Sequence, residues 1–320
     1  MALAARSLPF ALDCRACTAK PPAVPTSPPQ AQALGGTGMA DGVALALGAM
    51  VLYGLADWVY KRAAAKGIEA HHFLVLQSCF FTPGVFLYGL VTGTLVPGVA
   101  FLWGMLAGVL VFVALYNFAR SLKTGAVSIV VPVYRLSFAI TVVLAVWLLD
   151  EPLTGWKLAG LAASLVAVWL LLGGTARAAH ASWPAVAQVL VATLAMGVVS
   201  LVYKFGTNAG GSPATILAGQ ATVFLPLTIV FALIRDRGGF RPPPGAWRHS
   251  ATAALLFLSG LIMLIAGLQR GQASVLVPVA QLSFVVTVGL GFVFLGETLT
   301  RRKGLGLAFA IAALVCLTRS

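Results

Sequence analysis

The amino-acid sequence contains one motif twice, and both copies lie within long apolar segments. Residues 128–141 are Ser-Ile-Val-Val-Pro-Val-Tyr-Arg-Leu-Ser-Phe-Ala-Ile-Thr, and residues 274–287 are Ser-Val-Leu-Val-Pro-Val-Ala-Gln-Leu-Ser-Phe-Val-Val-Thr. The offset between the copies is constant, at 146 residues from Pro132 to Pro278. A duplicated apolar unit is typical of membrane proteins that are built from two related halves, as many transporters are.

The composition fits a chain that lies mostly in lipid. The sequence is 60% hydrophobic and 9% charged, whereas about a quarter of the residues of a soluble domain are charged. The net charge of +13 does not indicate nucleic-acid binding, because the basic residues are scattered through the connections between apolar segments. Short basic connections orient a membrane protein and meet lipid headgroups. The bilayer is therefore an expected partner, and nucleic acid is not.

Ten apolar stretches approach the length of about 20 residues that a membrane-spanning helix needs. Backbone groups in hydrocarbon must be satisfied within their own segment, so these stretches are expected to be helices of an all-α membrane protein. The predicted spans are 43–60, 72–92, 98–119, 126–149, 156–173, 183–203, 214–234, 251–268, 273–295 and 303–318.

The first parts of the two halves also match, with a slightly different offset. Tyr60-Lys61 corresponds to Tyr203-Lys204, 143 residues later. The three additional residues of the later offset fit the longer connection at 235–245. The repeated unit therefore has five helices, and an odd number places the second unit upside down relative to the first. We predict ten transmembrane helices, arranged as two inverted five-helix repeats around a central cavity.

The domain boundaries follow from this periodicity. We predict a first repeat at 43–174, a linker at 175–182 and a second repeat at 183–318. Residues 1–42 are rich in Pro and Ala and belong to neither repeat. They are interpreted as a disordered tail, as a transit-like peptide, or as sequence upstream of a true start at Met39. The plasma (inner) membrane is the expected location, or an organelle envelope if residues 1–38 are a transit peptide.

Three local patterns indicate a family. They are an aromatic-Gly pair followed by Lys, the Pro-containing start of the fourth and ninth spans, and a Glu motif at the end of each of those spans. The residues are Tyr53-Gly54 with Lys61, echoed by Gly197 and Lys204; Pro132 and Pro278; and Leu-Asp-Glu-Pro-Leu-Thr at 149–154, matched by Leu-Gly-Glu-Thr-Leu-Thr at 295–300.

In these patterns the chain resembles the EamA-type members of the drug/metabolite transporter superfamily, over about residues 43–318. The resemblance implies ten helices in two inverted repeats, and transport of small organic metabolites by alternating access. Tyr53 stands where a Trp is common in the family, and Asp57 and Arg135 are not family-wide features. These departures concern the polar residues that a substrate would meet.

Two charged residues lie inside predicted spans. Arg135 is about ten residues into the fourth span, and an Arg near the bilayer centre costs roughly 2.5–3.5 kcal/mol on insertion scales. It is interpreted either as an anchor for an anionic group of the substrate or as half of a structural ion pair. Asp57 has three interpretations: a local pair with Lys61 on one helix face, a proton-coupling site, or the partner of Arg135.

Further polar and proline residues complete the candidate site. Polar side chains are expected to line the cavity, although Ser137 and Ser283 have the alternative of bonding their own helix backbone or a neighbouring helix. The prolines are interpreted as kinks that gate transport or as sources of static curvature. Candidate substrate-binding residues are Tyr53, Asp57, Tyr116, Asn117, Tyr134, Arg135, Ser137, Gln220, Gln281 and Ser283, and candidate gating residues are Pro83, Pro132, Pro226 and Pro278.

The Glu motifs are interpreted as architectural. Thr154 and Thr300 are predicted N-caps of the fifth and tenth spans, and Glu151 and Glu297 are favourable near those helix starts. The four His residues lie at segment ends without metal-ligand spacing, so no metal and no cofactor is expected. The sequence contains no nucleophile–base set and no phosphate-binding loop, so an enzyme is not expected.

The sequence as a whole predicts a secondary transporter, present as a monomer or homodimer. Its substrate would be a small anionic or zwitterionic solute such as an amino acid, with export favoured and with a proton or counter-substrate as coupling partner. The alternatives are an intramembrane enzyme, a non-transporting membrane receptor and a passive channel. The positive-inside rule places both termini outside, whereas the family resemblance implies that both are cytoplasmic, so the orientation stays open.

Overall fold

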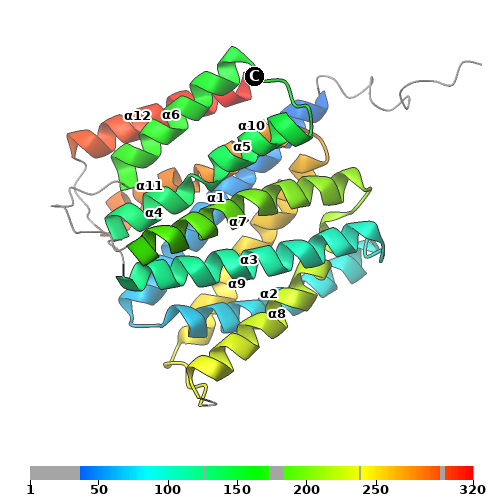
Figure 1. Ribbon diagram of the computed structural model, residues 1–320, viewed down its shortest axis with the longest axis vertical. Coiled ribbons are helices and arrows are strands. Elements are labelled where there is room, and N and C mark those ends of the chain that lie inside the picture. The colour runs from blue at the N-terminus through cyan, green and yellow to red at the C-terminus, as the bar shows by residue number, and fades with distance from the viewer. Residues whose placement is uncertain (1–36, 125–126, 173–182, 238, 296–299, 320) are drawn as a thin grey trace, which may run out of the picture. The chain divides into compact units, whose positions relative to one another are not determined.

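The computed structural model describes residues 37–124, 127–172, 183–237, 239–295 and 300–319, and all regular elements in these ranges are helices (Figure 1). The helices are α1 Thr37–Ala65, α2 Ala70–Thr92, α3 Val99–Thr124, α4 Val127–Arg135, α5 Ser137–Leu148, α6 Gly155–Leu172, α7 Trp183–Asn208, α8 Pro213–Arg235, α9 Ala246–Leu268, α10 Ala273–Gln281, α11 Ser283–Leu295 and α12 Arg301–Thr318.

Each of the ten predicted spans corresponds to helix, but two spans are broken into pairs of shorter helices. The fourth span forms α4 and α5, which are separated by Leu136, and the ninth forms α10 and α11, which are separated by Leu282. The two breaks lie 146 residues apart, so they occupy the same position of the repeat.

The breaks do not lie at the prolines. The helix continues through Pro278 for three further residues and ends at Gln281. At Leu282 the N–H bonds to carbonyls four and three residues back, and the N–H of Val285 then bonds to the carbonyl of Leu282 at 2.9 Å. A proline lacks the N–H group of one backbone hydrogen bond. The helix ends at the residue where backbone hydrogen bonds span three residues instead of four. The breaks at Leu136 and Leu282 lie four residues after Pro132 and Pro278, and a kink or a gating role of the two prolines stays a prediction.

Pro83 and Pro226 also lie within continuous helices, α2 and α8 respectively. Neither residue interrupts its helix. A role of these two prolines in gating stays a prediction.

The outer surface of the helices is apolar. Seven of the described segments are long and apolar enough to cross a membrane, and one of them, Ala273–Leu290, runs across the break at Leu282. Two shorter apolar segments accompany them: Val133–Leu148, which runs across the break at Leu136, and Gly155–Leu171. Trp147, Trp169 and Trp183 expose 73%, 67% and 76% of their surface. Such large exposed apolar side chains are unfavourable in water and are stable against lipid.

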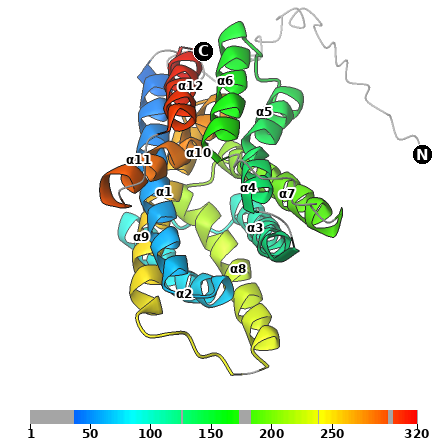
Figure 2. The same ribbon diagram turned by 90° about the vertical axis from the view of Figure 1, so that its left-hand side faces the viewer.

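The two halves pack in equivalent ways. Helix α3 contacts α7 and α8, and its repeat counterpart α9 contacts α1 and α2 (Figures 1 and 2). Helix α1 contacts α10 and α11, and its counterpart α7 contacts α4 and α5. Every one of these contacts recurs when the two halves are exchanged, so the fold is a two-repeat architecture.

Repeat-related helices that touch each other run antiparallel. In α6 and α12, which lie side by side in Figure 1, a Cβ added at Gly160 would meet Leu317, and one added at Gly306 would meet Leu171. The start of each helix thus packs against the end of the other. Helices α2 and α8 are likewise antiparallel, because His71 at the start of α2 bonds Asp236 at the end of α8.

Glycines allow close approach between the halves at repeat-related positions. A Cβ added at Gly54 of α1 would lie 2.4 Å from the Cβ of Val286, and one added at Gly197 of α7 would lie 2.8 Å from the Cβ of Ile140. Small residues that let helix backbones approach are the usual interface residues of membrane helices. This packing brings α1 against the break between α10 and α11.

Candidate functional site

An ion pair joins α1 to the break between α4 and α5. Nη2 of Arg135 donates to Oδ2 of Asp57 at 2.8 Å, and the hydroxyl of Ser283 lies 3.3 Å from the same oxygen as a second donor. Arg135 directly precedes the break at Leu136, and Ser283 directly follows the break at Leu282. We call Asp57, Arg135 and Ser283 the ion-pair cluster. Three chain segments that are far apart in sequence thus converge on one carboxylate.

The ion-pair cluster is accessible in part. The side chains of Arg135 and Asp57 are 21% and 29% exposed, whereas Ser283 is buried. A charge in the membrane interior requires a partner, because an uncompensated ion there loses its hydration without replacement. The structure contains the pair of Asp57 with Arg135, and the other two interpretations of Asp57 stay predictions.

Several predicted site residues flank this cluster. The ring of Tyr134, next to Arg135 in sequence, packs against Phe118 with a centroid distance of 4.3 Å. Ser137 follows the break and is buried, and its backbone carbonyl accepts a hydrogen bond from Thr141 at 3.2 Å. Gln281 is the last residue of α10, directly before the second break.

Two other predicted site residues make hydrogen bonds within the protein. The buried amide of Gln220 accepts a hydrogen bond from the hydroxyl of Tyr203. Asn117 donates to the carbonyl of Val113 in its own helix at 2.9 Å. These bonds satisfy polar groups inside the protein, and contact of either residue with a substrate stays a prediction.

Two tyrosines among the predicted residues have aromatic or cationic neighbours. The ring of Tyr53 is buried against Phe257 with a centroid distance of 5.3 Å. The hydroxyl of Tyr116 accepts a hydrogen bond from Nη1 of Arg120 at 3.1 Å. Contact of either tyrosine with a substrate stays a prediction.

The Glu151 carboxylate has an architectural role at a helix start, but not at the helix that was expected. Its two oxygens accept hydrogen bonds from the backbone N–H groups of Ala273 and Ser274 at 2.8 and 2.9 Å. Glu151 therefore caps α10 of the second half, because α10 begins with unpaired N–H groups and a positive end. The expectation that it serves the fifth span was wrong. Glu297 lies outside the described residues.

The predicted threonine caps are confirmed. Thr154 accepts a hydrogen bond from the N–H of Lys157 at 3.2 Å, and Thr300 accepts one from the N–H of Lys303 at 3.3 Å. These are the bonds that an N-cap hydroxyl makes to the third residue of a helix.

Two pockets open on the described surface. One, of about 320 Å³, is lined by Glu151, Lys204 and Gln272 among others. Nζ of Lys204 donates there to the carbonyls of Leu268 and Gly271 at 2.6 and 2.8 Å. The charged groups of this pocket thus already bond backbone groups at helix ends, which indicates a structural role.

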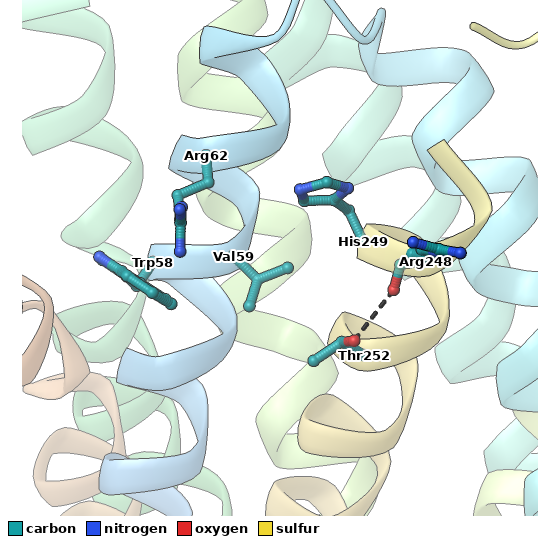
Figure 3. A pocket seen from close by; sticks show the side chains of 6 residues that line it. All are labelled: Trp58, Val59, Arg62, Arg248, His249 and Thr252. Atoms are coloured by element: carbon teal, nitrogen blue, oxygen red, sulfur yellow. Dashed lines mark hydrogen bonds between the residues drawn. The ribbon is translucent and has the colours of Figure 1, made fainter. Parts of the chain in front are cut away.

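The second pocket, of about 140 Å³, lies between α1 and α9. Figure 3 shows Val59 of α1 and His249 and Thr252 of α9 in the space between the two helices, and the lining is completed by Trp58 and Arg62 on α1 and Arg248 on α9. The guanidinium of Arg62 lies over the ring of Trp58, 4.7 Å from its centroid. The pocket combines cationic and apolar groups next to the turn of α1 that carries Asp57.

The structure also contains a cluster of two histidines and one aspartate that was not predicted from the sequence. Nε2 of His71 lies 2.8 Å from Oδ1 of Asp236, and Nε2 of His72 lies 2.9 Å from Oδ2 of the same residue. Desolvation raises the pKa of Asp236 and the hydrogen bonds from both histidines lower it, and the net pKa is below the ordinary value of a carboxyl. The carboxylate is therefore ionised. Only the adjacency of the two histidines is visible in the sequence.

Comparisons with known proteins agree with the duplicated architecture. A model of the EamA-like transporter family matches residues 40–173 and 183–319. A solved structure that is titled only as the crystal structure of a protein superposes with a TM-score of 0.75, covering 87% of this chain and 96% of that chain at 16% identity. At this identity the likeness is one of fold.

A curated relative matches a shorter region. An uncharacterized protein of Methanocaldococcus jannaschii is 32% identical over 72 residues, which are 22% of this chain and 53% of that protein. The chain therefore spans about half the length of this relative.

Proposed function

We propose a transport function for this chain, which belongs to the EamA-like transporter family and is a multi-pass membrane transporter. The proposed substrate is a small organic solute with a carboxylate group, which moves past the ion-pair cluster by alternating access. An amino acid or a similar zwitterion fits best. Its carboxylate would bind Arg135 and its ammonium group would bind Asp57.

The proposed architecture has ten membrane crossings in two inverted repeats, at 43–174 and 183–318, with a linker at 175–182. The antiparallel contacts of α2 with α8 and of α6 with α12 support the inversion. The proposed cavity lies between the repeats, where α1 meets the break between α10 and α11. Discontinuous helices at such a site offer backbone groups to a ligand.

The observation that carries the proposal is that the second half has no equivalent of the ion pair. Ser200 occupies the repeat position of Asp57, and Gln281 occupies that of Arg135. The fold is therefore compatible with uncharged residues at both positions. Charge that the architecture does not require, placed in a partly exposed position inside the helices, is a functional site by default.

A zwitterionic substrate also satisfies the electrostatics of exchange. When the carboxylate of the solute takes the place of Asp57 at the guanidinium, its ammonium group compensates Asp57, so neither ion is left unpaired. A purely cationic solute would leave Arg135 uncompensated. Export is the favoured direction, and a proton or a counter-substrate is the proposed coupling partner.

The test is transport by the purified protein in proteoliposomes, using a panel of amino acids, small carboxylic acids, sugars and polyamines. Arg135→Gln should lower kcat/KM for carboxylate-bearing solutes at least about 10-fold, equivalent to about 1.4 kcal/mol. Arg135→Lys should retain part of the activity. Gln is a suitable replacement because it occupies the equivalent position 281.

Arg270→Gln is the matched control, because Arg270 is exposed and donates a local hydrogen bond, to the carbonyl of Ala266 in the last turn of α9. This variant should transport like wild type. Wild-type kinetics of Arg135→Gln for every carboxylate-bearing solute, or transport restricted to sugars or polyamines, would overturn the proposal.

A further inference from the structure

The cluster of His71, His72 and Asp236 lies outside the proposed transport site and joins two repeat-related helices. The histidines belong to the first turn of α2, and Asp236 directly follows α8. The side chains are only 6%, 12% and 15% exposed. Their ligand atoms all lie within 4.8 Å of one another. Three donors are thus held together and mostly removed from water before any ligand arrives.

The donor set is specific in its chemistry. Two imidazole nitrogens and one carboxylate oxygen are the ligands of many zinc sites, with bonds of about 2.0–2.2 Å and a fourth position for water. Calcium and magnesium prefer six or more oxygen ligands or a largely retained water shell. We propose that His71, His72 and Asp236 form a binding site for a divalent transition-metal ion, with Zn²⁺ as the best match.

The second nitrogen of His71 supports this assignment. Its Nδ1 lies 3.2 Å from Oε2 of Glu69. In a neutral His71 that donates from Nε2 to Asp236, the lone pair of Nδ1 would face the Glu69 carboxylate, which is repulsive. A metal ion on Nε2 moves the proton to Nδ1, where it bonds Glu69. Carboxylates that orient metal-binding histidines in this way are a regular feature of zinc sites.

A nitrogen that binds a metal ion carries no proton, so metal binding should weaken in acid. The neighbours Arg235 and Arg237 are exposed, so water and salt screen their repulsion of a cation.

The site is present at one end of the α2–α8 pair only. The repeat positions of His71 and His72 are Ala214 and Thr215. Asp236 belongs to the longer connection at 235–245, which also supplies Phe240, whose ring packs edge-on against His72 with a centroid distance of 5.1 Å. A bound metal ion would fix the start of α2 to the end of α8 and should stabilise the protein against unfolding.

The experiment uses the full chain, purified in detergent with an affinity tag that contains no histidines and washed with a chelator. Titration with Co²⁺ should give the visible bands of a four- or five-coordinate ion with one equivalent bound, and Zn²⁺ should displace it. His71→Ala/His72→Ala should lose this equivalent. Asp236→Asn should bind at least about 10-fold more weakly, and Glu69→Ala about 10–100-fold more weakly.

His249→Ala is the matched control, because His249 lies in the next helix and contacts the carbonyl of Gly245 at 3.0 Å. It should bind Co²⁺ like wild type. Wild type that binds no more Co²⁺ than His71→Ala/His72→Ala, or His249→Ala that loses the bound equivalent, would overturn the proposal. If the double variant does not fold, His72→Gln takes its place with the same criteria. The readout is independent of transport, so it stands or falls separately from the proposed substrate.

Discussion

Two hydrogen bonds that cross between the halves can be compared directly because repeat-related residues make them. Thr141 of α5 donates to the carbonyl of Gly197 at 2.8 Å, and Thr287 of α11 donates to the carbonyl of Gly54 at 3.1 Å. The hydroxyls of Tyr60 and Tyr203 likewise bond Gln77 and Gln220. The halves have kept these contacts, which join helices through backbone or neutral groups.

The charged contacts differ between the halves. At one end of the α2–α8 pair His72 bonds the carboxylate of Asp236, whereas at the other end its counterpart Thr215 donates to the carbonyl of Thr94 at 3.0 Å. The pair of Asp57 with Arg135 likewise has no charged counterpart. The comparison teaches that the shared contacts maintain the fold, and that the differences mark the candidate chemistry.

The largest effect is expected from making the halves alike at the ion pair. Asp57→Ser/Arg135→Gln installs the residues of positions 200 and 281 in the first half. Transport of carboxylate-bearing solutes should fall to background while the free energy of unfolding stays near that of wild type, because both charges are removed together. Proteoliposome transport and unfolding in detergent measure the two quantities.

The single variant Asp57→Ser sharpens this result. It leaves Arg135 without its partner and should be less stable than the double variant, by about 1–3 kcal/mol given the partial exposure of the pair. Equal stability of the single and double variants would mean that the pair contributes nothing to folding. Retained transport in the double variant would contradict the assignment of the site.

A medium effect is expected at the two glycines that face the opposite half. Gly54→Ala and Gly197→Ala should each destabilise the protein by about 1–3 kcal/mol through overpacking. Gly54→Ala should have the larger effect, since its added Cβ lies closer to its neighbour, at 2.4 Å against 2.8 Å. Thermal unfolding in detergent provides the measurement.

Gly304→Ala is the matched control for these two variants. No atom lies within 4 Å of a Cβ added at Gly304, which lies within α12. This variant should be stabilised by up to about 1 kcal/mol, because Ala favours helix over Gly. Opposite signs at Gly54 and Gly197 would show that the halves are not packed alike.

The smallest effect is expected at the two threonines. Thr141→Val and Thr287→Val each remove one hydrogen bond to a glycine carbonyl and keep the side-chain volume. Hydrogen bonds between membrane helices contribute about 0.6 kcal/mol on average, so both variants should lose roughly that amount in an unfolding titration. A loss at one threonine several times that at the other would break the equivalence.

The sequence predicts the helices well because each span is long and apolar. It does not predict the breaks at Leu136 and Leu282, which lie four residues after Pro132 and Pro278 and are marked by backbone hydrogen bonds over three residues. The interpretation of Asp57 as the partner of Arg135 was within reach, because their depths in the predicted spans are similar and only a few partners exist for a charge in lipid.

The cluster of His71, His72 and Asp236 could not be predicted from the sequence. His72 and Asp236 are 164 residues apart, and they meet only because α2 and α8 are antiparallel neighbours. Glu151 was misassigned for a similar reason: its carboxylate crosses to α10 of the other half, where three-dimensional proximity rather than chain order decides which helix start it caps.

The contact of α6 with α12 has a consequence for how such a chain can arise. Gly160 packs against Leu317 and Gly306 packs against Leu171. Each of the two helices therefore has a glycine near its start and a leucine near its end, and each glycine receives the leucine of the other helix. Two identical copies of α6 packed side by side in antiparallel orientation would make the same pair of contacts. The interface is self-complementary, and a gene encoding a single five-helix unit could form it with a second, oppositely inserted product before any fusion of the two.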